Sequence, residues 1–215
     1  CTILFHVDDC KISHVESKVL DDTIAWLKRD YESIFEDGSG EMKVHRGLVH
    51  KYLGMTLDFS TKRQVKISMT DYVREIVEAW DKAELEANDG FIEKKVRKSR
   101  NRTSAAPEDL FKIDEDAAKL SKEQATKFHN IVAKALYVSK RARPDTSVAI
   151  AFLTTRVREP DVDDWKKLKH LIEYLRATKD LPLILGADNT GVMEWFVDAS
   201  IAVHPNNRVH TGGGM

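Results

Sequence analysis

Two prolines divide the middle of this 215-residue chain into three stretches with helical spacing. Apolar residues recur every three or four positions over residues 122–141, over 145–158 and again beyond Pro160, and this period is typical of amphipathic helices. Pro144 and Pro160 stand between the stretches, where proline ends a helix because it lacks the amide hydrogen and restricts the preceding residue. Ser121 opens the first stretch with a capping-box pattern. These features predict a packed helical unit.

Strand patterns flank the helical stretches on both sides. Apolar residues follow the two-residue alternation of strands or form short apolar runs bounded by turn residues. The expected elements are a hairpin over 2–13, a helix over 17–35, strands over 47–59 and 63–68, a helix from 70, an irregular loop over 88–118, and strands over 183–187, 192–200 and from 209. This order predicts an α/β (α+β) chain in which a second unit begins near residue 181.

Charge and cysteine content exclude several classes of protein. Lys and Arg number 34 and Asp and Glu 35, so the net charge of -1 excludes a binder that relies on bulk positive charge. No apolar run approaches the ~18 residues that span a bilayer. Cys1 and Cys10 cannot build a disulfide scaffold, and we expect an intracellular setting: cytoplasm, virus-like particle or nucleus. The chain begins without a methionine, so we expect it to be a piece of something longer.

The hairpin over residues 2–13 carries two adjacent carboxylates, Asp8 and Asp9, at its centre. Neighbouring strand residues point to opposite faces, so only a tight turn brings both carboxylates to one site. Their like charges favour either a bound cation or full solvation. Mg²⁺ prefers carboxylate oxygens, which makes the pair a predicted metal site for phosphoryl transfer. The alternative is a solvated turn. Zinc is disfavoured because Cys1, His6, Cys10 and His14 fit no common finger spacing.

Five segments together resemble one protein family. The run from Ile3 to Asp9 resembles the Tyr-x-Asp-Asp box of reverse transcriptases, with His6 where tyrosine is usual. Four later segments resemble, in the same order, boxes of copia-type retrotransposon polymerases: Tyr52–Phe59, Lys127–Tyr137, Arg143–Asp145 and Trp165–Thr178. The chain is therefore identified as similar to a copia-type Pol polyprotein from the reverse transcriptase into ribonuclease H.

The resemblance implies three parts and a divided active site. Residues 1–69 would be a partial palm, residues 70–180 the helical thumb and connection with the basic loop at 88–118, and residues 181–215 a truncated start of ribonuclease H. Asp8 and Asp9 would be two of three carboxylates that bind two Mg²⁺ ions, the third lying upstream of Cys1. Implied partners are an RNA or DNA template-primer, dNTPs and the remaining Pol polyprotein, with no membrane. The isolated chain is not expected to polymerise.

Two further sites follow from the same resemblance. Tyr52, Leu53, Gly54 and Met55 would hold the primer terminus, with Gly54 allowing close approach of the backbone; alternatively they are core strand residues. Asp198 lies on a strand that resembles the first strand of ribonuclease H, where an aspartate anchors Mg²⁺; alternatively it caps a turn at the strand end.

A basic run within the loop is the remaining predicted contact. The run consists of Lys94, Lys95, Arg97, Lys98, Arg100 and Arg102. These side chains would bind the phosphate backbone of a nucleic acid independently of its sequence. Alternatively, they belong to a solvated loop. A rival interpretation of the chain is a non-catalytic, degenerate retroelement remnant or a nucleic-acid-binding module. The carboxylates expected upstream and downstream, which this chain lacks, support the rival, and departures such as His6 and Ala133 are compatible with a decaying copy. The hairpin lacks sheet partners, so we also expect an exposed apolar edge and poor solubility.

Overall fold

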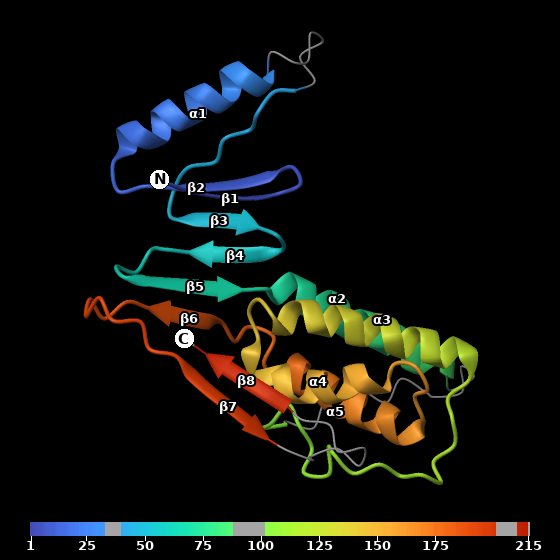
Figure 1. The fold of residues 1–215 in the computed structure, drawn as a ribbon. Coiled ribbons are helices and arrows are strands. Elements are labelled where there is room, and N and C mark those ends of the chain that lie inside the picture. The colour runs from blue at the N-terminus through green and yellow to red at the C-terminus, as the bar shows by residue number, and fades with distance from the viewer. Residues whose placement is uncertain (33–39, 88–101, 201–209, 215) are drawn as a thin grey trace.

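A computed structural model describes residues 1–32, 40–87, 102–200 and 210–214 of the chain. It contains a four-stranded antiparallel sheet with a helical unit beside it, and a hairpin with one helix lies beyond the first strand of that sheet (Figure 1). A second hairpin near the C-terminus forms a separate two-stranded sheet. The fold is mixed helix and strand, and it places two tight turns where the predicted site residues lie.

The N-terminal hairpin is confirmed. Strands β1 (Thr2–His6) and β2 (Asp9–Ser13) are antiparallel, with His6 opposite Asp9, so that the turn holds two residues. Helix α1 (Ser17–Tyr31) follows, and the remainder of the helix expected up to residue 35 lies largely outside the described residues. No residue of α1 is buried, and Phe5 in β1 is 80% exposed. The hairpin and α1 therefore carry apolar side chains that the described part of the chain leaves in solvent, as expected for the hairpin.

The strand expected over residues 47–59 is in fact a hairpin. Strand β3 (Val49–Tyr52) turns through Leu53 and Gly54 into β4 (Met55–Asp58), and β5 (Gln64–Ser68) pairs with β4 as expected. The prediction of one strand was wrong because the apolar pattern runs unbroken through the turn, in which Gly54 is the only typical turn residue.

The C-terminal strands do not all belong to a separate unit. Strand β6 (Leu183–Gly186) pairs with β5 and closes the order β3-β4-β5-β6, although the predicted boundary at residue 181 separates the two strands. Strands β7 (Phe196–Ser200) and β8 (His210–Gly214) form the second hairpin. The strand pairing of the four-stranded sheet therefore ends after β6 and not before it. The sequence did not predict this, because pairing between strands more than 100 residues apart leaves no local pattern in the sequence.

The helical unit agrees closely with its prediction. It contains α2 (Thr70–Ala87), α3 (Lys122–Ser139), a 3-10 turn (Pro144–Thr146), α4 (Ser147–Arg156) and α5 (Val162–Ala177). Ser121 and Gln124 form the capping box. The apolar stripes meet in one core, where the rings of Trp80 and Trp165 lie 4.7 Å apart between centroids. Within the described residues, no helix is long and apolar enough to cross a membrane.

The described part of the predicted loop is irregular but not detached. Residues 102–118 contain turns without a helix or a longer strand, while residues 88–101 lie outside the description. Leu110 is 2% exposed, and Phe111 meets the ring of Phe152 edge-on at 5.7 Å. The loop therefore contributes side chains to the core of the helical unit.

Candidate functional site

The turn of the first hairpin places the two predicted metal ligands. Val7 and Asp8 are its central residues, and Asp9 begins β2. Val7 has φ +53° while Asp8 does not have a positive φ, which is the sign pattern of a type II′ turn. Glycine is the usual residue at that first position, and a β-branched residue there is an outlier that stores strain. The backbone is thus held in a costly conformation directly beside the carboxylates.

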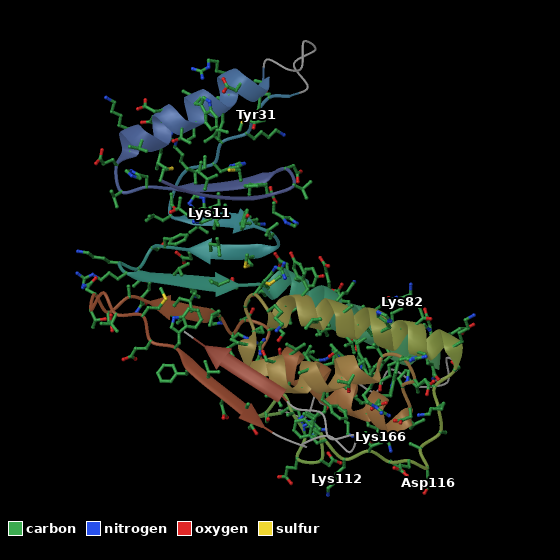
Figure 2. All side chains as sticks on the ribbon, viewed as in Figure 1. Lys11, Tyr31, Lys82, Lys112, Asp116 and Lys166 are labelled. Carbon is green, nitrogen blue, oxygen red and sulfur yellow. The ribbon has the colours of Figure 1, made fainter. Side chains whose placement is uncertain are left out.

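The register of the hairpin determines which side chains share a face with Asp9. Because paired residues share a face and faces alternate, Asp9 lies on the same face as His6, Lys11 and Leu4, while Phe5 and Cys10 lie on the other. Lys11 reaches toward the four-stranded sheet, with its Nζ 5.3 Å from the ring centroid of Phe59 (Figure 2). The pairing pattern therefore gives Asp9 a basic neighbour on its own face.

Asp8 and Asp9 fit part of a magnesium site. Both residues are exposed, and carboxylate oxygens are the donors that Mg²⁺ prefers. Two such residues next to one another in a turn can bind a cation, and the rest of its coordination would come from water, substrate or other residues. Among the described residues, no three or more His, Cys, Asp or Glu side chains form a group that could hold a metal ion. Cys1, His6, Cys10 and His14 are described residues and belong to no such group.

The second predicted site, residues 52–55, is the turn between β3 and β4. Leu53 (φ +50°) and Gly54 (φ +75°) are both left-handed, which is the pattern of a type I′ turn. A Cβ at Gly54 would meet only ordinary contacts, the nearest at 3.6 Å to Met69, so the glycine is required by its φ. In Figure 1 this turn and the turn of the first hairpin point to the same side of the strands, the side from which α2 departs.

Helix α3 contacts this second turn through a tyrosine that the sequence prediction did not single out. The hydroxyl of Tyr137 donates to the Leu53 carbonyl at 3.0 Å. The Tyr137 ring stacks on Tyr72 of α2 at 5.2 Å between centroids, and the Arg141 guanidinium lies 3.5 Å from its centre. Burial raises the pKa of Tyr72, with a smaller contribution from Tyr137. Helical spacing alone identifies α3, but no sequence signal reports a contact that spans 84 residues.

Asp198 stands apart from both turns. It lies in β7 and is exposed, as are its neighbours Phe196 and Val197, and its Oδ1 accepts the amide of Ala199 at 2.8 Å. An open hollow on this hairpin is lined by Trp195, Phe196, Val197, Asp198, Gly212 and Gly213. The ribonuclease H role of Asp198 remains a prediction.

Most of the predicted basic contact lies outside the described residues. This applies to Lys94, Lys95, Arg97, Lys98 and Arg100. Arg102 is described, and its Nε donates to Glu173 of α5 at 2.8 Å in a half-buried ion pair. A nucleic acid would have to share or displace this carboxylate to contact Arg102. Its role in binding phosphate stays a prediction.

Comparison with known proteins gives two matches. A Retrovirus-related Pol polyprotein from transposon RE2 of Arabidopsis thaliana is 32% identical over 88 residues, which is 41% of this chain and 6% of that protein. A transposon Ty5-1 protein of Saccharomyces cerevisiae is 23% identical over 213 residues, which is 99% of this chain and 60% of that protein. The chain thus spans less than two thirds of either relative. No family model and no solved structure matches it. The two matches support an origin of the chain in a retrotransposon Pol polyprotein.

Proposed function

We propose that this chain is part of an RNA-directed DNA polymerase of a copia-type retrotransposon, in which Asp8 and Asp9 bind Mg²⁺. The observation that carries the proposal is the strained two-residue turn, which exposes Asp8 and places Asp9 directly beside it. The transposon relatives and the order of the five family-like segments support the same assignment. The reaction is attack of a primer 3′-hydroxyl on a dNTP, directed by a template.

In this proposal the residues of the chain bind and position, because phosphoryl transfer demands little else of a protein. When bound, Mg²⁺ neutralises the charge that develops on the transferred phosphate. Asp8 and Asp9 hold the cation, and the turn at Leu53 and Gly54 places the primer end. Asp198 would serve the separate ribonuclease H site, and the remainder of the Pol polyprotein would complete both sites.

The test is primer extension on a homopolymer template with Mg²⁺. Two proteins are compared: this chain, and the chain joined to the coding sequence on either side of it in its genome. We expect only the longer protein to incorporate dNTPs, because two carboxylates form an incomplete two-metal site. Asp8→Asn should abolish incorporation, whereas Asp22→Asn, an exposed carboxylate of α1, should leave it unchanged.

A folded longer protein that extends no primer would contradict the proposal and favour the non-catalytic remnant. A gel-shift assay with a primer-template then separates the two forms of that alternative. Binding that weakens steeply with salt indicates a nucleic-acid-binding module, since phosphate contacts release counterions. Equal activity of the Asp8→Asn protein and the parent would contradict the assignment of the metal site.

A further inference from the structure

We infer that Tyr137 is a positioning residue that fixes the turn at Leu53 and Gly54 relative to helix α3. The link between this turn and a primer end rests on the proposed function, whereas the positioning itself rests on the contacts of the described residues. Three observations carry the inference: the state of the turn, the way the tyrosine is held, and the absence of the same contact from its stacked neighbour.

The turn needs an external partner. In a two-residue hairpin the flanking residues Tyr52 and Met55 complete the ladder, and the carbonyl of Leu53 is left outside it. Leu53 has a Cβ and yet adopts φ +50°, a left-handed conformation that is strained for such a residue. The Tyr137 hydroxyl supplies the missing hydrogen bond at 3.0 Å to this strained residue.

The donor is itself held in place by two neighbours. Tyr72 stacks on the ring of Tyr137 with 27° between the planes, and the Arg141 guanidinium lies over the ring and donates to the Tyr137 carbonyl at 3.3 Å. A ring fixed in this way loses little additional side-chain entropy when its hydroxyl bonds to Leu53. The Tyr137 side chain therefore fixes the turn relative to α3.

The chain offers a matched control for this contact. Tyr72 and Tyr137 are half-buried partners in one stack, yet among the described residues the Tyr72 hydroxyl makes no hydrogen bond. Tyr137→Phe and Tyr72→Phe each remove one oxygen and keep the stacking. Only Tyr137→Phe removes the bond to the turn.

The first experiment is amide hydrogen exchange on the full chain, read at Met55, which pairs with Tyr52 across the turn. A neutral hydrogen bond contributes about 1 kcal/mol, so Tyr137→Phe should accelerate exchange at this amide about fivefold. Tyr72→Phe should leave exchange there unchanged, and strands β5 and β6 should be unaffected in both variants. Equal exchange at the turn in the two variants and the parent would overturn the inference.

A rescue variant distinguishes positioning from general loosening. Asparagine tolerates the left-handed region, and Asn-Gly is the favoured sequence of a type I′ turn. Adding Leu53→Asn to Tyr137→Phe should therefore restore slow exchange at Met55. Failure of this rescue would indicate that the tyrosine acts on the packing of α3 and not on the turn.

The second experiment asks what the positioning serves. In the longer protein of the primer-extension assay, Tyr137→Phe should raise the KM for the primer-template several-fold and change kcat little, while Tyr72→Phe should change neither. Without any primer extension, the proposed function fails and the exchange result still decides whether Tyr137 positions the turn. An unchanged KM together with accelerated exchange would remove the role in primer placement.

Discussion

The Nη2 of Arg143 donates to the hydroxyl of Thr178 at 2.7 Å, and its Nη1 donates to the Thr178 carbonyl at 2.9 Å. The same guanidinium binds both carboxylate oxygens of Asp145, and the Tyr174 hydroxyl donates to that carboxylate at 2.7 Å. Arg143 is 2% exposed. This network joins the Arg-Pro-Asp segment after α3 to the end of α5. Two of the family-like segments are therefore parts of one buried contact in this chain.

Replacing Arg143 should destabilise the helical unit strongly. Arg143→Lys keeps the charge but loses the planar fork that serves Asp145 and Thr178 together, and breaking a buried pair costs about 3–5 kcal/mol. We expect a loss of about 3 kcal/mol in the free energy of unfolding, measured by urea denaturation. Arg29→Lys, at a 73% exposed side chain, is the control and should change stability by less than about 0.5 kcal/mol. Equal urea midpoints for the two variants would refute this role.

The same network predicts acid sensitivity. Burial raises the pKa of Asp145, but hydrogen bonds from Arg143 and Tyr174 and the charge of Arg143 outweigh it, so the net pKa is lowered. A lowered folded-state pKa means that the stabilisation is present above the unfolded pKa of about 3.9 and is lost as pH falls through the folded value. The difference in melting temperature between the parent and Asp145→Asn should be constant above about pH 5 and shrink below about pH 4. A difference that is independent of pH would contradict it.

The features predicted correctly are those with local causes. The capping box at Ser121, the helix boundary at Pro144 and the buried stripe of α5 each depend on residues within one or two turns of helix. The hairpin over residues 2–13 was also predicted, but with its turn at Asp8 and Asp9, whereas the structure places the turn one residue earlier, at Val7 and Asp8. In these places the period of apolar residues and the stereochemistry of single residues determine the structure.

The features missed depend on distant partners. The pairing of β6 with β5 and the bond from Tyr137 to Leu53 each join segments that are 84 or more residues apart. The burial of Leu110 depends on packing against the helices of its own unit. Exposed and buried versions of such segments have similar sequences. The candidate site was therefore predictable as a pair of carboxylates, but its neighbouring turn and the helix that holds it were not.

The loop over 102–118 should prove necessary for stability. Leu110 is 2% exposed within the core, and truncating a buried leucine costs about 2–5 kcal/mol through lost burial and the cavity left behind. We expect Leu110→Ala to lower the free energy of unfolding by about 3 kcal/mol in urea denaturation. Leu85→Ala in α2, where the leucine is 67% exposed, should have little effect. An unchanged free energy of unfolding in Leu110→Ala would show that the loop does not stabilise the helical unit.

The turn between β3 and β4 should not tolerate a side chain at its second position. Gly54 has φ +75°, and forcing an L-residue into that region costs about 1–2 kcal/mol although the space for a methyl group exists. Gly54→Ala should therefore lower the melting temperature by several degrees, as measured by circular dichroism. Gly212→Ala introduces the same methyl group into open space without a positive φ and should be nearly neutral. Equal effects of the two substitutions would locate the cost elsewhere than in the backbone.

The first hairpin should become more stable when its strain is removed. Val7 adopts φ +53°, which is costly for a β-branched residue by about 1–3 kcal/mol, whereas glycine adopts it freely at an entropic cost of about 0.5–1 kcal/mol. The first effect exceeds the second, so Val7→Gly should slow amide exchange across β1 and β2 several-fold. Val15→Gly replaces an exposed valine of ordinary φ and should not slow it. Faster exchange in the Val7→Gly hairpin would mean that the valine side chain, 90% exposed, is held by contacts that outweigh its strain.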